Sequence, residues 1–225
     1  MAPLPLALFD LDHTLLSGDS DELWCAFLVA HGQLDASVLR RMAALAAAYR
    51  AGSASPADFC GFHAGLLAGR SPAQWSPWRE RFHAEAVRPR IPAAARALLQ
   101  RHRDAGDVLV LTTASNRVIV ELAAADLGVD HLLATEVELL GGSYSGRLRG
   151  TPNLRDGKLE RLRSWLVSQG WPPETLASAT FYSDSINDLP LLSAVGRPVA
   201  VDPDAQLLAA AQARGWPVLQ LQRDA

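Results

Sequence analysis

Two aspartates follow the first apolar run of the chain almost at once. In the stretch LALFDLDHTLLSG, Asp10 and Asp12 come after the run and Thr14 lies two residues further. Residues two apart in a strand point to the same side, so the two carboxylates are expected to project together from the strand end. Two carboxylates this close repel each other unless a cation or a proton lies between them. The spacing favours a metal-assisted acid–base site, with a surface turn as the alternative for this stretch alone.

A second acidic group ends the run FYSDSINDLP. Asp184 follows an apolar run here, and Asn187 and Asp188 come shortly after it. Asn187 or Asp188 could also cap a helix that starts near Leu189, a role compatible with a place in a site. Open α/β sheets bind ligands at the carboxyl ends of their strands, so Asp10 and Asp184 are expected to meet there. Hard oxygen ligands from two strand ends suit Mg²⁺, which needs few protein oxygens and keeps several waters.

Hydroxyl and cationic side chains provide two further features. The run VLVLTTASN ends in Thr112 and Thr113 and is expected to open a helix, whose first N–H groups would bind an anion. Lys158 in RDGKLERL lies near the start of another helix, where it opposes the helix dipole unless an anion is near. On its own, Lys158 could equally be a solvated surface lysine. Taken together, the two features predict an anion-binding site.

Short apolar runs are the candidates for the strands that position these side chains. They cover residues 5–9, 107–111, 131–135, 178–183, 197–201 and 216–221. Such continuous runs are typical of strands buried on both faces of a parallel sheet. Helical patterns such as 118–127 and 159–167 lie between them, which predicts an α/β fold with right-handed crossovers. Gly141 and Gly142, between two alternating runs, predict a β-hairpin within this order.

One interval breaks the alternation of strands and helices. Residues 17–88 carry helix signals and no convincing strand. One helical face is marked by apolar residues at three- and four-residue spacing, namely Leu39, Met42, Leu45 and Tyr49. Pro56 and Pro72 are placed where the first turn of a helix tolerates proline. A small helical bundle is therefore expected to be inserted after the first strand.

The composition is that of an ordinary globular domain. Hydrophobic residues make up 49% and charged residues 20% of the 225 residues, which is enough chain for one core with a smaller insertion. The net charge of −3 gives no sign of a nucleic-acid-binding surface. No apolar run reaches the roughly 20 residues that span a bilayer. Cys25 and Cys60 are interpreted as buried reduced thiols, which favours a cytoplasmic location.

The four features occur in an order that resembles the haloacid dehalogenase-like hydrolase superfamily. The order is D-x-D-x-T, a strand-terminal threonine, a lysine and D-x-x-N-D. The helical insertion after the first motif is similar to the phosphoserine phosphatase-like branch, subfamily IB, which has a helical C1 cap. The resemblance covers nearly the whole chain. It implies a doubly wound, parallel Rossmann-like core over residues 1–16 and 89–225, with a helical cap over 17–88.

The resemblance also implies roles for the acidic residues. Asp10 is expected to be the nucleophile that forms an aspartyl-phosphate. Asp12 is expected to protonate the leaving alcohol and then to deprotonate the hydrolytic water. Mg²⁺ would be held by the Asp10 carboxylate, the Asp12 backbone carbonyl and Asp184, and Asp188 would orient this site from outside the ligand set.

The remaining motif residues are implied to bind the phosphoryl group. Lys158 would neutralise its charge. Alignment of TAS with the second motif favours Thr113 over Thr112 as the hydroxyl that binds the phosphoryl oxygens. Asn187 is expected to touch the phosphate or the nucleophile.

The substrate is less well defined by the sequence. In phosphoserine phosphatases an acidic residue at the position of Asp19 contacts the substrate amine, although Asp19-x-x-Glu22 also fits a helix cap. The cap arginine that grips the substrate carboxylate in those relatives is replaced here by His63, with Arg70 seven residues beyond. Histidinol phosphate is the preferred substrate, since it bears an amine and no carboxylate. Phosphoserine and other small or lipid phosphomonoesters are the alternatives.

Two other classes of function share these motifs. A phosphotransferase would pass the phosphoryl group to an alcohol instead of water. A non-catalytic binding module could keep the same fold, although the intact motif set speaks against it. The expected partner is a small phosphomonoester, without nucleic acid and without a membrane span.

Overall fold

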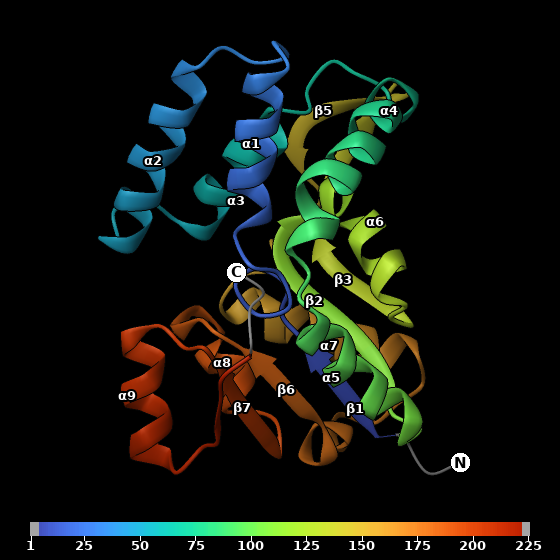
Figure 1. The fold of residues 1–225 in the computed structure, drawn as a ribbon, viewed down its shortest axis with the longest axis vertical. Helices are drawn as coiled ribbons and strands as arrows, with labels where there is room; N and C mark the ends of the chain where they lie inside the picture. Colours follow the sequence, from blue (N-terminus) through green and yellow to red (C-terminus); the bar gives the residue numbers. More distant parts are fainter. Residues whose placement is uncertain (1–4, 222–225) are drawn as a thin grey trace.

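A six-stranded parallel sheet forms the centre of the molecule. The computed structural model describes residues 5–221. The strands lie in the order β3-β2-β1-β6-β7-β8, and each neighbouring pair is parallel (Figure 1). Their bounds are β1 Leu6–Phe9, β2 Val108–Asn116, β3 His131–Thr135, β6 Thr180–Ser183, β7 Arg197–Val201 and β8 Val218–Leu219. The predicted parallel α/β sheet is confirmed.

Helices precede, flank and follow these strands. Between β1 and β2 lie α1 Ser20–Ala30, α2 Ser37–Arg50, α3 Pro56–Gly65, α4 Pro72–Phe82, the π-helix η1 His83–Val87, the 3-10 turn η2 Arg88–Arg90 and α5 Ala93–Asp104. The later helices are α6 Arg117–Leu127, α7 Asp156–Ser168, η3 Pro173–Ser178, η4 Ile186–Asp188, α8 Leu189–Leu192 and α9 Ala205–Arg214. Helices α1 to α4 lie together beyond one end of the sheet (Figure 1).

Alternating side chains of the strands divide the core into two layers. Ala7 and Phe9 of β1 pack in one cluster with residues of α5 and α6, whereas Leu6 and Leu8 pack in another with residues of α7, α8 and α9. This is the two-residue period of a strand with both faces covered. Strand β1 is buried along its whole length. The chain order reverses direction between β1 and β6, which creates the crevice where such sheets bind ligands.

The helices between β1 and β2 begin where their capping residues predict. Ser55 and Ser71 each form a capping box with the residue three positions later, and Pro56 and Pro72 occupy the first helical position. Helix α2 contains all four residues of the predicted helical face, and Tyr49 is buried in its last turn. Buried side chains of this region, among them Trp24 and Phe82, belong to the same apolar cluster as Phe9 of the sheet.

The hairpin is confirmed, and two strand predictions need correction. Strands β4 Val137–Leu140 and β5 Ser143–Leu148 pair antiparallel around Gly141 and Gly142, whose positive φ angles of 58° and 83° suit a tight hairpin turn. Strand β8 covers two residues of the predicted 216–221. Strand β2 extends beyond the predicted 107–111 to Asn116, because its threonines pair with β3.

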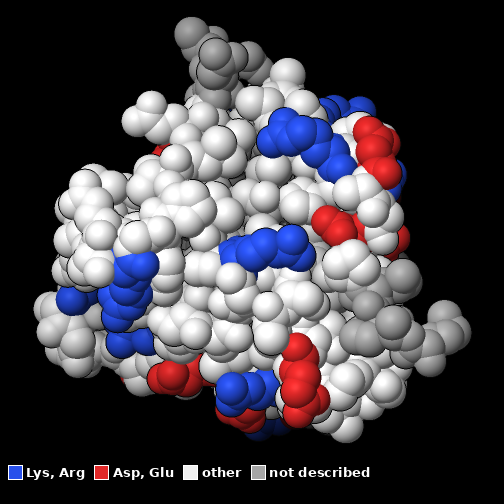
Figure 2. Space-filling model, turned by 90° about the horizontal axis from the view of Figure 1, so that it is seen from below, with Lys and Arg blue, Asp and Glu red and all other residues white. Residues whose placement is uncertain are grey.

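The surface shows charges of both signs. On the face seen in Figure 2, small groups of basic and acidic side chains lie among uncharged residues, and at two places groups of opposite charge lie side by side. Within residues 5–221, no helix is both long and apolar enough to cross a membrane.

Candidate active site

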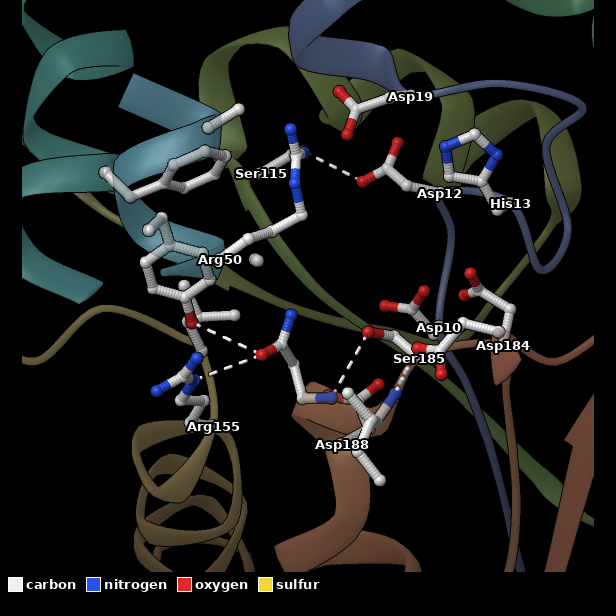
Figure 3. Close-up of a pocket in the computed structure, with 18 of the residues that line it drawn as sticks. Asp10, Asp12, His13, Asp19, Arg50, Ser115, Arg155, Asp184, Ser185 and Asp188 are labelled. Carbon is white, nitrogen blue, oxygen red and sulfur yellow. Dashed lines mark hydrogen bonds between the residues drawn. The ribbon is translucent and has the colours of Figure 1, made fainter. Parts of the chain in front are cut away.

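A pocket of about 620 Å³ opens beyond the carboxyl ends of β1 and β6. Asp10 and Asp12 follow β1, and Asp184 and Asn187 follow β6, and all four line the pocket (Figure 3). Residues of α1, α2 and α3 line it as well. The structure thus brings together the acidic groups of the first and fourth sequence motifs.

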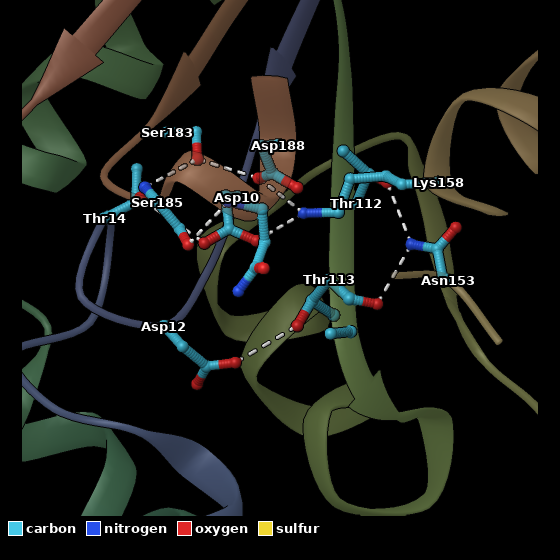
Figure 4. A network of polar contacts seen from close by, with 12 residues as sticks. Asp10, Asp12, Thr14, Thr112, Thr113, Asn153, Lys158, Ser183, Ser185 and Asp188 are labelled. Atoms are coloured by element: carbon cyan, nitrogen blue, oxygen red, sulfur yellow. Dashed lines mark hydrogen bonds and ion pairs between the residues drawn. The ribbon is translucent and has the colours of Figure 1, made fainter. Parts of the chain in front are cut away.

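Lys158 lies at the floor of this pocket between two carboxylates. Its Nζ donates to Asp10 Oδ1 at 2.9 Å and to Asp188 Oδ2 at 2.7 Å (Figure 4). Lys158 is only 2% exposed, so the interpretation as a solvated surface lysine is wrong. Ser183 also donates to Asp188, at 2.7 Å, which fixes this carboxylate beneath the lysine. The lysine needs both carboxylates, because a buried ammonium without partners is strongly destabilising.

The proton affinity of Asp10 follows from its surroundings. Burial raises its pKa well above the usual value, and the carboxylates of Asp188, Asp184 and Asp12 raise it further. The Lys158 ammonium acts in the opposite direction. One lysine therefore does not compensate the acidic groups gathered here, and the site favours a further cation.

Thr14 joins the two strand-end carboxylates. Its hydroxyl lies 3.4 Å from Asp10 Oδ2 and 3.0 Å from Asp184 Oδ1, and it accepts from the Asp184 N–H at 3.0 Å. Burial raises the pKa of Asp184 to about 7, with further increases from Asp188 and Asp12. Within the described residues, no lysine, arginine or histidine forms an ion pair with Asp184. The two carboxylates offer hard oxygen donors on the pocket side, the donor type that Mg²⁺ prefers.

The metal site implied by the sequence motifs includes one backbone carbonyl. In residues 5–221, no three His, Cys, Asp or Glu side chains converge as a metal-ligand set. The ligands implied for Mg²⁺ are two carboxylates and one backbone carbonyl, and Mg²⁺ usually completes its shell with water. The Asp184 carboxylate and the Asp10 oxygen that does not contact Lys158 therefore fit such a cation.

Asp12 points into the pocket above Asp10 and is held by three donors. The N–H of Ser20 donates to its Oδ1 at 2.7 Å. The hydroxyls of Ser115 and Thr113 donate to its Oδ2 at 2.9 and 3.2 Å. These bonds fix the carboxylate over the space in front of Asp10 (Figures 3 and 4), where a group that exchanges protons with a bound substrate is needed.

The two threonines of β2 face opposite sides of the strand. Thr113 reaches Asp12, whereas the hydroxyl of Thr112 accepts from Asn153 Nδ2 at 3.0 Å (Figure 4). Helix α6 begins at Arg117, close to the predicted 118–127, and β2 continues to Asn116, so three residues separate Thr113 from the start of the helix. An anion site at this point therefore depends on side chains and not on the first turn of α6.

Asn187 lies at the pocket wall between two partners. Its Oδ1 accepts from Arg155 Nε at 3.0 Å and from the Tyr49 hydroxyl at 3.5 Å. Neither Asn187 nor Asp188 caps a helix by its side chain, since Ser185 accepts from the Asn187 N–H and Asp188 makes no capping bond. Both side chains are thus available to the site.

Asp19 caps α1 and also lines the pocket, and its contact with a substrate amine stays a prediction. Its Oδ1 accepts from the Glu22 N–H at 2.9 Å. Burial raises the pKa of its carboxyl, and the carboxylate of Asp12 adds to this rise.

His63 is placed behind the pocket wall. It is buried, does not line the pocket and has its Nδ1 3.5 Å from Asp21 Oδ1. Burial lowers the pKa of its imidazole to about 4, so the ring is neutral at pH 7. The expected direct contact of His63 with the substrate is not supported by this position.

Several residues of the site escaped the sequence reasoning. Asn153 is fully buried, and its Nδ2 also donates to the carbonyls of Thr113 and Leu133 at 2.9 and 3.1 Å. Arg155 and Ser115 belong to no pattern that local spacing reveals, and Tyr49 was marked by its spacing as part of a helical face and not as a site residue. His13 and Arg155 both line the pocket with positive φ angles, 56° and 53°, which are rare outside glycine and which the spacing of residues does not reveal.

Comparisons with known proteins agree with this geometry. The family model of haloacid dehalogenase-like hydrolases matches residues 7–193. A histidinol-phosphatase of Neisseria meningitidis serogroup C (strain 8013) is 38% identical over 216 residues, which cover 95% of this chain and 97% of that protein. Phosphoserine phosphatase SerB1 of Mycobacterium tuberculosis (strain ATCC 25618 / H37Rv) is 35% identical, with 94% of this chain and 69% of that protein covered.

Solved structures show the same fold. A protein of unknown function from Bordetella pertussis Tohama I is 42% identical and superposes with a TM-score of 0.91 over 97% of this chain and 99% of that one. A phospho-aspartyl intermediate analogue of phosphoserine phosphatase gives a TM-score of 0.70 over 98% and 95% of the two chains. At 17% identity this second likeness concerns the fold alone.

Proposed function

The chain belongs to the haloacid dehalogenase-like hydrolase family and is a phosphomonoester hydrolase, and from this premise we propose that it is Mg²⁺-dependent and forms an aspartyl-phosphate on Asp10. The observation that carries the proposal is the Asp10 carboxylate, which lies at the pocket floor with one oxygen on the Lys158 ammonium. A carboxylate held by one cation keeps a defined orientation and a second oxygen for attack on phosphorus.

The reaction has two balanced steps. In the first, Asp10 attacks the phosphorus, the bond to the ester oxygen breaks, and Asp12 gives its proton to the leaving alcohol. In the second, Asp12 takes a proton from a water molecule that attacks the phosphorus of the aspartyl-phosphate. The bond between Asp10 and phosphorus then breaks, and the Asp10 carboxylate is restored with release of phosphate.

The other residues stabilise the phosphoryl group during transfer. The Lys158 ammonium lies within hydrogen-bond distance of Asp10, and it offsets the negative charge that the phosphoryl oxygens bring. We assign the amide of Asn187 to these oxygens as a donor. The hydroxyl of Thr113 joins it when its hydrogen bond to Asp12 is exchanged for one to the phosphoryl group. When bound by Asp10, the Asp12 carbonyl and Asp184, with Asp188 orienting the site, Mg²⁺ supplies charge neutralisation of the transferred group.

We propose histidinol phosphate as the substrate. The similarity to a histidinol-phosphatase supports this choice. Asp19, Asp21 and Glu22 of the α1 region line the pocket together with Arg50, and these carboxylates support a substrate with a basic nitrogen. Phosphoserine is the second candidate, favoured by the similarity to phosphoserine phosphatase SerB1.

Residues 17–88 act in this proposal as the cap. Their helices contribute Tyr49 and Phe59 to the pocket wall, so they shield the reacting groups from bulk water. A small pocket beneath helices favours small metabolites as substrates. We place the enzyme in the cytoplasm, since Cys25 and Cys60 are free and buried.

Phosphate release from a panel of phosphomonoesters tests the proposal. The panel contains histidinol phosphate, phosphoserine and an aryl phosphate, each with Mg²⁺ and with EDTA. Asp10→Asn is the inactive variant, and Asp35→Asn, an exposed aspartate outside the pocket, is the matched control. We expect turnover that is lost with Asp10→Asn or EDTA and kept with Asp35→Asn. Equal activity of Asp10→Asn and the native protein would overturn the proposed nucleophile.

A further inference from the structure

Asn187 is held by donors from two different parts of the chain. Arg155 precedes α7, the helix that carries Lys158, whereas Tyr49 lies in the last turn of α2. Both place a donor on Asn187 Oδ1, and all three residues line the pocket. Arg155 lies at the edge of the pocket, away from Asp12 (Figure 3). One amide therefore connects the region around α2 with the loops that hold the charged groups.

The partners define which way the amide faces. A guanidinium has donors and no acceptor, so the Asn187 atom 3.0 Å from Arg155 Nε must be the carbonyl oxygen. The Tyr49 hydroxyl is a donor as well, because burial raises its pKa to about 12 and keeps it protonated. The NH₂ group is then directed away from both partners. Among the described residues it has no recorded acceptor, which leaves two N–H donors for a ligand.

Arg155 is itself fixed from two sides. Its guanidinium carbon lies 4.5 Å from the centre of the Tyr49 ring. Like the hydrogen bond from Tyr49 to Asn187, this cation–π contact joins α2 to the loops of the pocket. Its backbone has a φ of 53° and a ψ of −126°, a conformation that costs energy for any residue except glycine. Strain of this kind persists where surrounding contacts hold the residue, and here the contacts are Tyr49 and Asn187.

We propose that Arg155 and Tyr49 are positioning residues that fix the Asn187 amide with its NH₂ group toward the phosphoryl oxygens. This inference rests on the proposed function and adds a regulatory element to it. Tyr49 lies in the cap, so movement of the cap away from the core removes one donor of Asn187 and the ring beneath Arg155. Phosphate affinity is then greatest when the cap is closed.

Binding of inorganic phosphate tests the proposal without turnover. Calorimetry with Mg²⁺ present compares the native protein with Arg155→Ala, Asn187→Ala and the double variant. We expect a loss of affinity of about tenfold for Arg155→Ala, the effect of one hydrogen bond. The double variant should bind as weakly as Asn187→Ala alone, because Arg155 acts through the amide. If the two losses multiply, Arg155 acts independently of Asn187 and the proposal is overturned.

Two further variants separate the side chain from the backbone strain. Arg155→Gly relieves the strain and removes the guanidinium, so we expect the same loss as for Arg155→Ala. Recovery of native affinity in Arg155→Gly would show that only the backbone matters and would refute the proposal. Arg155→Lys should not restore binding, since lysine lacks the planar fork. Thermal unfolding verifies that each variant is folded.

Kinetics distinguish a failure of this inference from a failure of the proposed function. Aryl phosphate turnover that disappears with Asp10→Asn establishes the hydrolase whatever Arg155 does. Tyr49→Phe keeps the ring and loses the hydroxyl, so it should weaken phosphate binding less than Arg155→Ala, given the longer bond of 3.5 Å. A Tyr49→Phe protein that loses more affinity than Arg155→Ala would contradict the assigned order of the two donors.

Discussion

Replacement of Lys158 by methionine is the perturbation whose effect the structure defines best. Lys158 is the single lysine of the chain. Its ammonium contacts Asp10 and Asp188, and both carboxylates are buried. Methionine keeps much of the volume of lysine and removes the charge. The variant therefore leaves two buried carboxylates without their shared cation.

The size of the effect follows from the burial of this group. Removal of one partner from a buried ion pair costs about 3–5 kcal/mol of unfolding free energy. The loss must depend on pH, because removal of the Lys158 ammonium raises the folded-state pKa of Asp10 still further above that of the unfolded chain. Carboxyls with raised folded pKa values destabilise the protein above their unfolded pKa, and this cost increases with pH. We expect the full loss at pH 8 and a smaller loss at pH 5, where the carboxyls take up protons.

Urea unfolding followed by circular dichroism at pH 8 and pH 5, in the presence of EDTA, measures this loss. Adding Asp10→Asn and Asp188→Asn to Lys158→Met should restore much of the stability, because the uncompensated charges are gone. Arg81→Met is the control, since its pair with Glu85 is exposed and should change the stability little. A loss below about 1 kcal/mol at pH 8, or one that does not depend on pH, would refute the role of Lys158 as the buried counter-ion.

Three further predictions concern pH, packing and metal. Burial raises the folded pKa of Asp21 to about 8 and that of Asp184 to about 7, so the folded metal-free protein binds more protons than the unfolded chain. Its free energy of unfolding should therefore fall by about 1–2 kcal/mol from pH 7 to pH 8.5. A free energy of unfolding that rises over this range, measured by urea denaturation, would contradict this. Asn153→Ala removes the amide that donates to buried carbonyls of β2 and β3 and should cost about 2–4 kcal/mol. A loss under about 1 kcal/mol in the same urea unfolding experiment would show that water replaces the amide. Mg²⁺ should raise the melting temperature of the native protein and not that of Asp184→Asn. Equal shifts of the two melting temperatures would show that Asp184 is not a ligand of the metal ion.

The sequence was most informative where function depends on strand ends. Asp10, Asp184 and Lys158 each follow or begin a regular element, and parallel packing brings them together whatever the details of the loops. The same logic predicted the parallel sheet and the helices between β1 and β2. Periodicity and capping are local signals, so they could be read without knowing the tertiary contacts.

Contacts that depend on loop geometry could not be read in this way. Asn153 and Arg155 lie in a segment without periodicity, and their partners are far away in the chain. The strand end predicted at Leu111 was wrong, because pairing with β3 continues β2 to Asn116. His63 was expected near the substrate, and burial behind Asp21 became visible only in the folded chain.

The covalent intermediate on Asp10 is the central claim, and borohydride trapping tests it most directly. Borohydride reduces an acyl-phosphate, so a protein quenched during turnover with Mg²⁺ should carry homoserine in place of Asp10, detectable by peptide mass spectrometry. The account predicts this conversion at Asp10 alone, and only when a phosphomonoester substrate is present. Turnover without conversion of Asp10, or conversion of Asp12 or Asp184 in its place, would contradict it.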